Sequence, residues 1–145
     1  MLHRYLIFFS VLLIGLSRSA TAQNDFCGIS NKCIRDGEKL NFRVYYNLSA
    51  IWVAAGEANF TTRQETLNGH SVFHITGDGQ TYKSYDWIYR VRDRYETYID
   101  AETLLPLKFL RNVDEGGYKF TNNVTFDQEH RKAYSNKKTY NVPQC

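Results

Sequence analysis

Three arginines at alternate positions are the residues whose types and spacing point most directly to binding chemistry. Arg90, Arg92 and Arg94 are separated by single residues, so a β-strand would direct all three side chains to one side. Three guanidinium groups on one side could bind a phosphate or a carboxylate. The simpler interpretation is a solvated face that nearby carboxylates neutralise, with the candidates Asp86, Asp93, Glu96 and Asp100.

A group of aromatic residues is the second candidate for a binding site. The chain contains 11 Tyr and 9 Phe, and tyrosine can lie half-buried with its hydroxyl in water. Such rings could line an apolar cavity under a curved sheet, and ordinary core packing is the alternative. The candidate ligand-binding residues are Trp52, Tyr82, Tyr85, Trp87 and Tyr89, together with the three arginines.

Two histidines have the spacing of helical metal ligands, but their surroundings predict a strand. The segment 70–77 contains both His70 and His74, is rich in β-branched and aromatic residues, and directly follows a hairpin turn. Four residues along a strand separate the two imidazoles by about 13 Å, so we expect structural histidines, no metal and no cofactor. We also expect no enzyme, because no Ser-His-Asp group, glycine-rich phosphate loop or paired-carboxylate pattern stands out. An enzyme would need a cleft with perturbed groups such as Asp78, Asp86 or His74.

Alternating apolar and polar residues predict that the rest of the chain forms β-strands. Asn68-Gly69 and Asp114-Glu115-Gly116-Gly117 are hairpin signals, Gly56 indicates a bulge, and Gly77-Asp78-Gly79 indicates a turn that ends a strand. Short polar turns require antiparallel neighbours. We predict a mainly all-β antiparallel meander, curved into a barrel-like or half-barrel sheet. Its seven strands are expected at residues 38–46, 51–63, 70–77, 92–100, 107–113, 118–126 and 132–142.

Residues 82–91 interrupt this pattern and predict a short helix or an irregular crossover. Tyr85, Ile88 and Tyr89 have the spacing of one helical face, and Asp86 and Arg90 have the spacing of an i,i+4 ion pair.

The first 22 residues are typical of a secretory signal peptide. Arg4 precedes the apolar run Leu6–Leu16, and Ala20-Thr21-Ala22 supplies the small residues of a cleavage site. The run is too short for a transmembrane span. Removal of the segment leaves one β-rich domain at residues 23–145, with 16 basic and 15 acidic residues, and this balance gives no support for a nucleic-acid partner.

The compartment in which the chain folds determines whether its cysteines can form a disulfide. In an oxidising compartment Cys27 and Cys33 could form a disulfide around a five-residue loop, or both could stay reduced. Cys145 is then an odd cysteine, and the spacing gives a zinc site little support.

An ordered set of short motifs resembles the bacterial domain-of-unknown-function family 3108. The set comprises Asn31-Lys32-Cys33, Asp36-Gly37-Glu38-Lys39-Leu40, Val44-Tyr45-Tyr46, Ala55-Gly56-Glu57-Ala58, Ser84-Tyr85-Asp86-Trp87, Val91-Arg92-Asp93-Arg94-Tyr95-Glu96, Thr103-Leu104-Leu105-Pro106 and Glu115-Gly116-Gly117-Tyr118. The resemblance is to the exported members found in Bacteroidota. It implies an exported, β-rich domain with no catalytic residues to carry over, and a domain that continues past Cys145, so we expect this chain to be its N-terminal part.

These observations together predict an exported module in the periplasm of a Gram-negative bacterium. The first hypothesis is non-enzymatic binding of an apolar or amphipathic ligand against the aromatic residues. The alternative is a protein-interaction or structural module of the envelope, which would use edge strands and the arginine face of Arg90, Arg92 and Arg94.

Overall fold

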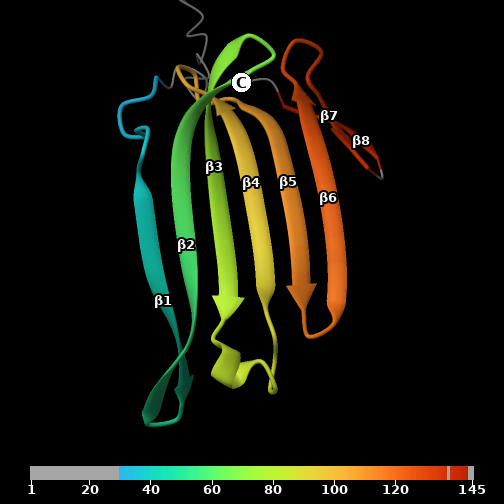
Figure 1. Cartoon of the computed structure of the whole chain (residues 1–145). Helices are drawn as coiled ribbons and strands as arrows, with labels where there is room; N and C mark the ends of the chain where they lie inside the picture. The colour runs from blue at the N-terminus through green and yellow to red at the C-terminus, as the bar shows by residue number, and fades with distance from the viewer. Residues whose placement is uncertain (1–29, 137, 144–145) are drawn as a thin grey trace, which may run out of the picture.

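The part of the chain that the structure describes folds into one antiparallel β-sheet whose eight strands lie in the order of the sequence (Figure 1). A computed structural model describes residues 30–136 and 138–143. Within these residues no helix has the length and apolar character needed to cross a membrane. The strands are β1 (Lys39–Leu48), β2 (Ile51–Leu67), β3 (His70–Thr81), β4 (Arg92–Asp100), β5 (Pro106–Glu115), β6 (Tyr118–Asp127), β7 (Lys132–Ser135) and β8 (Thr139–Asn141).

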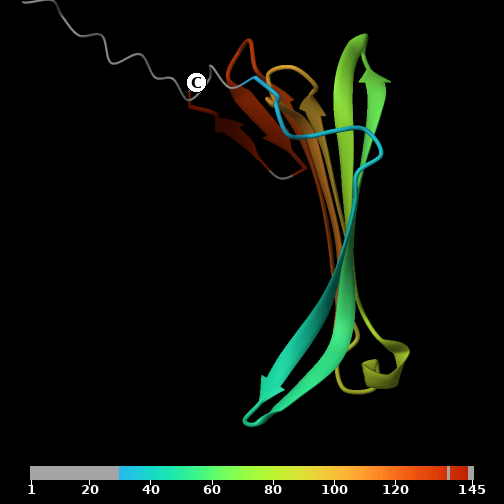
Figure 2. The ribbon, with the colours of Figure 1, turned by 90° about the vertical axis from the view of Figure 1, so that its left-hand side faces the viewer.

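The predicted antiparallel meander is confirmed, and over the described residues the sheet is open, since β1 and β8 do not pair with each other. Each strand pairs with the next one in the chain, from β1 with β2 to β7 with β8. Figure 2 shows the strands nearly edge-on as a single bent layer. The predicted signal peptide, Cys27 and Cys145 lie outside the described residues.

The turn chemistry is as the sequence predicts. Asn68 and Gly69 both have positive φ, as do Gly116 and Gly117, which is the conformation of the two-residue turns that suit twisted hairpins. The predicted irregularity at Gly56 is also present, because the register between β1 and β2 shifts there and Ala55 becomes an extra residue. A side chain at Gly56 would collide with the Gln80 carbonyl oxygen.

Two strand predictions were wrong. The sequence Gly77-Asp78-Gly79 does not end β3, which continues to Thr81. Gly77 is needed inside the strand because the Phe60 ring lies across it, 2.8 Å from where a Cβ atom would stand. The last predicted strand is divided into β7 and β8, because the Ser135 N–H donates to the Lys138 carbonyl (2.9 Å) and reverses the chain.

The sheet separates a polar face from an apolar face, and few side chains are fully covered. Register pairing puts Arg94, Asp78 and Thr76 on the polar face, and Leu40, Phe60 and Tyr95 on the apolar face. In the described part of the chain, five apolar side chains are buried: Ala55, Val72, Phe73, Val113 and Ala133. The apolar side of β1 is exposed, with Phe42 at 53%.

We expect valine at position 77 to destabilise the sheet, because its side chain must displace the Phe60 ring. Overpacking of this kind costs about 1–3 kcal/mol. Gly79→Val is the matched control, since it lies two residues further along the same face of β3 and a Cβ atom there has its nearest contact at 3.9 Å. Urea unfolding should give Gly77→Val the lower free energy of unfolding, and equal stability of the two variants would contradict this packing argument.

Candidate functional site

An apolar cleft of about 390 Å³ lies between the crossover that joins β3 to β4 and the outer part of the β1–β2 hairpin. Three tyrosines and one isoleucine provide most of its large side chains, so it offers apolar contact area together with hydroxyl groups. We call it the tyrosine cleft, and its lining residues are Tyr46, Val53, Ala55, Thr81, Tyr85, Ile88 and Tyr89.

Successive backbone hydrogen bonds wind the crossover into the conformation that places these side chains together. The Tyr82 N–H donates to the Ala55 carbonyl (2.9 Å), which fixes the start of the crossover to β2. A short 3-10 helix, η2 (Lys83–Tyr85), follows. The N–H groups of Ile88 and Tyr89 both donate to the Tyr85 carbonyl (2.9 and 3.2 Å). The predicted interruption of the strands is therefore an irregular crossover with one short 3-10 helix, and Tyr85, Ile88 and Tyr89 line one cleft although only Tyr85 lies in η2.

A charged clamp holds the crossover against β3 and β4. Arg92 donates to the Asp86 carboxylate (2.7 Å) and to the Thr81 carbonyl (3.0 Å). The Thr81 hydroxyl donates to Asp86 (2.8 Å), and this hydrogen bond, with Arg92 beside it, lowers the pKa of Asp86 from its ordinary value. The predicted i,i+4 ion pair between Asp86 and Arg90 is wrong, because the crossover is not a regular α-helix and Arg92 reaches Asp86 instead.

Two of the five aromatic residues that the sequence suggests for ligand binding line the tyrosine cleft. Tyr85 and Tyr89 line the cleft, and Tyr82 is half-buried next to them without lining it. Trp52 and Trp87 are 67% and 83% exposed and do not line it. Tyr46, Val53, Ala55 and Thr81 line the cleft without a signal in the sequence, whereas helical spacing indicates Ile88.

Each of the three arginines contacts a different carboxylate. Arg90 lies 3.3 Å from Asp114, and Arg94 contacts Asp78 (2.9 Å) and Glu96 (3.0 Å). Asp86 and Glu96 were predicted to neutralise these arginines, whereas Asp78 and Asp114 come from other strands and were not foreseen. Arg90, Arg92 and Arg94 are thus parts of ion pairs within the chain.

His74 lies between two carboxylates on the polar face. Its Nδ1 is 3.2 Å from Glu65, its Nε2 is 2.8 Å from Glu96, and its ring stacks on Tyr98 at 4.2 Å between centroids. Burial of Glu96 opposes its ionisation, but hydrogen bonds from Arg94 and His74 outweigh burial and lower the pKa of Glu96. His70 and His74 are both strand residues of β3, as predicted. The described residues contain no group of three His, Cys, Asp or Glu side chains suited to hold a metal ion.

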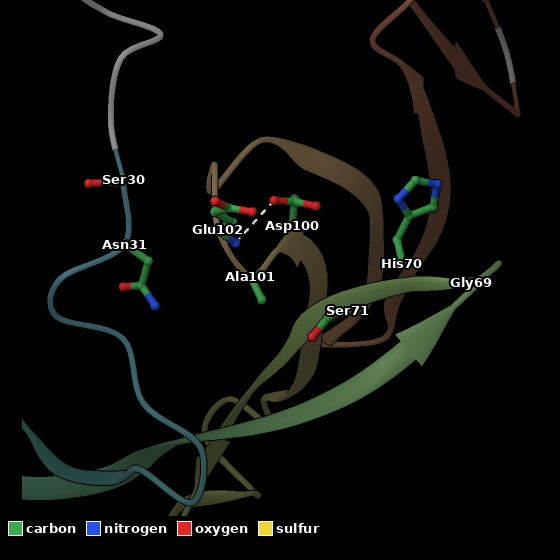
Figure 3. A pocket seen from close by; sticks show the side chains of 8 residues that line it. All are labelled: Ser30, Asn31, Gly69, His70, Ser71, Asp100, Ala101 and Glu102. Atoms are coloured by element: carbon green, nitrogen blue, oxygen red, sulfur yellow. Dashed lines mark hydrogen bonds between the residues drawn. The ribbon is translucent and has the colours of Figure 1, made fainter.

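A second, polar cleft of about 500 Å³ lies where the segment before β1 meets the β2–β3 and β4–β5 turns (Figure 3). Its polar groups mainly stabilise the turn. The Asp100 carboxylate accepts hydrogen bonds from the N–H groups of Thr103 (2.8 Å) and Glu102 (3.0 Å), and the Thr103 bond is the chief reason that the pKa of Asp100 is lowered. The Asn31 N–H donates to the backbone carbonyl of Glu102 (2.9 Å), which joins the segment before β1 to the β4–β5 turn. Cys33 is exposed.

The family resemblance is confirmed by comparison with known families. The model of a protein family of unknown function, DUF3108, matches residues 41–145. The chain belongs to this family. The matched segment of this DUF3108 chain contains every residue that lines the tyrosine cleft. Comparison with curated proteins and with solved structures gave no match.

We expect the hydrogen bonds of Glu96 with Arg94 and His74 to make the free energy of unfolding depend on pH in the acid range. Since the pKa of Glu96 is lower in the folded chain, its contribution is present above the unfolded value of about 4.3 and is lost as the pH falls through the folded value. Glu96→Gln should therefore lose less stability than the parent chain between pH 7 and pH 3, measured by urea unfolding. Glu129→Gln, on an exposed turn, should keep the parent profile; the same profile in both variants would refute the assignment.

Proposed function

We propose that this DUF3108 chain is an exported, non-enzymatic module of the bacterial periplasm that binds an apolar or amphipathic ligand in the tyrosine cleft. The observation that carries the proposal is the convergence of Tyr46, Tyr85, Ile88 and Tyr89 on one cleft from two separate parts of the chain. Its volume of about 390 Å³ falls within the range of small-molecule sites.

The chemistry of the lining supports an apolar ligand. Val53, Ala55 and Ile88 offer no hydrogen bonds from their side chains, and the tyrosines add ring faces with a polar tip. The hydroxyl of Thr81 is already fully used, because it donates to Asp86 and accepts from the Val91 N–H (3.0 Å) and Arg92 (3.1 Å). The lining thus favours contact with carbon over polar recognition.

The clamp supports a preformed site. Arg92 ties Thr81, Asp86 and Val91 together, so the crossover is held by hydrogen bonds before any ligand is present. A preformed cleft binds with less loss of conformational entropy than one that must order its loop.

The alternative, a protein-interaction module, draws support from the length of the first edge strand. β1 has ten residues and pairs with β2 on one side only among the described strands, and an unpaired strand edge can accept a strand from a partner. The arginine face gives less support, because Arg90, Arg92 and Arg94 already contact carboxylates.

We expect Ile88→Asp to weaken binding of a neutral apolar fluorophore, N-phenyl-1-naphthylamine, by about tenfold or more, because it places a charge in the cleft. The matched control is Trp87→Asp. Trp87 is the preceding residue, is also apolar and exposed, and does not line the cleft. Fluorescence titration should show a loss for Ile88→Asp alone. Equal effects of the two variants, or no binding to the parent chain, would overturn the assignment of the site.

We expect export to depend on the apolar run near the N-terminus. Leu13→Arg inserts a charge into Leu6–Leu16 and should prevent delivery of an alkaline phosphatase fusion to the periplasm of a Gram-negative host. Phosphatase activity of intact cells is the measurement, and Leu13→Ile is the conservative control. Undiminished activity in the arginine variant would contradict the signal-peptide assignment.

A further inference from the structure

The apolar face of the sheet carries a row of aromatic rings that crosses several strands. Phe42 of β1 meets Phe60 of β2 edge to face at 5.9 Å between centroids, and the Phe60 ring lies over Gly77 of β3. Gly77 pairs with Tyr95 of β4, whose ring is 6.4 Å from Phe109 of β5. Phe42 and Phe60 are 53% and 41% exposed, so this row is accessible apolar surface and a candidate binding surface.

One cation interrupts this surface. Arg111 of β5 pairs with Tyr95 and lies on the same face, with its guanidinium carbon 5.6 Å from the Tyr95 ring centroid and 5.4 Å from that of Phe120. Its Nε atom is buried and has no hydrogen-bond partner. A buried donor without a partner is unfavourable, so packing within the described part of the chain leaves one hydrogen-bonding group of Arg111 unsatisfied.

Arg111 also differs from the neighbouring arginines in its charge partners. In the described part of the chain no carboxylate oxygen lies within ion-pair distance of Arg111, whereas Arg90 and Arg94 both have such partners. Glu115 interacts with Arg111 electrostatically without reaching ion-pair distance, and a hydrogen bond with Asp93 raises the pKa of Glu115. The guanidinium is therefore a cation that its own chain does not neutralise by contact.

We propose that the apolar face binds a single-chain amphiphile with an anionic head, which Arg111 contacts while the alkyl chain lies across Tyr95 and Phe60. From β5 to β1 there are four strand spacings, about 19 Å, which suits an extended chain of about a dozen carbons or more. This surface shares no residue with the tyrosine cleft, so the inference goes beyond the proposed function and can fail independently of it.

Charge decides between this ligand and other occupants of the face. An uncharged apolar segment would cover Arg111 and leave a desolvated cation without a partner, which is strongly unfavourable. A second copy packed face to face would bring its own Arg111 to the same surface, since a two-fold interface uses the same patch on both subunits. An anionic head supplies the missing charge and a hydrogen-bond acceptor.

The test is calorimetric titration of the purified chain with dodecanoate and with dodecyl maltoside, each below its critical micelle concentration. We expect dodecanoate to bind about tenfold more tightly than the neutral amphiphile, and acetate, which has the head without the chain, to bind negligibly. Arg111→Leu should remove the preference for dodecanoate, and Arg111→Lys should retain part of it. The control is Lys108→Leu, which removes a cation that lies 5.8 Å over Tyr98 on the opposite face of the same strand.

The proposal would be overturned by the lack of a preference for dodecanoate in the parent chain, by an unchanged preference in Arg111→Leu, or by an equal loss of preference in Lys108→Leu. Binding of acetate as tight as that of dodecanoate would also overturn it, since the site would then be an anion site. Circular dichroism and thermal melting confirm that each variant is folded, and Arg111→Gln replaces Arg111→Leu if the latter is not. Ile88→Asp should leave the preference unchanged, which separates this site from the tyrosine cleft.

Discussion

The rest of the structure depends on one constraint: a single β-sheet has two faces, and the described residues contain no second layer to cover either of them. A layer normally buries its apolar face against another layer. Here few apolar side chains are buried, chiefly Val72, Phe73 and Val113, so cross-strand pairs must supply much of what a core supplies elsewhere. The side chains of the polar face pair with one another, whereas those of the apolar face stay partly exposed, and this difference determines where ligands can bind.

The polar face is stabilised by side chains that satisfy one another across strands. The Thr61 and Thr76 hydroxyls are 2.6 Å apart between β2 and β3, and Arg94 connects Asp78 of β3 with Glu96 of its own strand. His74 extends the network to Glu65 of β2. Charges that are paired in this way position the strands and are already engaged, so this face is organised for structure. The apolar face has contacts between rings but leaves area exposed, and this exposed area is what a ligand can cover.

The sequence predicted local features well because local chemistry determines them. Asn68-Gly69 and Gly116-Gly117 allow the positive φ values of tight hairpins, and the alternation of apolar and polar residues predicts strands. Contacts between distant residues could not be read in this way. Gly77 looks like a turn residue until the Phe60 ring is known to lie across it, and Asp86 has Arg90 at helical spacing although Arg92 is its partner. Of the tyrosine cleft, helical spacing indicated Tyr85, Ile88 and Tyr89, whereas Tyr46 and Val53 join it only through the β1–β2 pairing.

The arginines show why residue type and spacing alone do not identify a binding group. Arg90, Arg92 and Arg94 have the conspicuous pattern, yet each contacts carboxylates of its own chain. Arg111 belongs to no recognisable motif in the sequence. In the fold its guanidinium lies near the rings of Tyr95 and Phe120, and its Nε atom has no hydrogen-bond partner. A paired cation contributes mainly to position, because a ligand would have to displace its partner first. An unpaired cation on an apolar surface lowers the free energy of any complex that brings an anion with a hydrocarbon chain. The lack of a carboxylate in contact with Arg111 among the described residues is therefore what indicates the kind of ligand that this surface would bind.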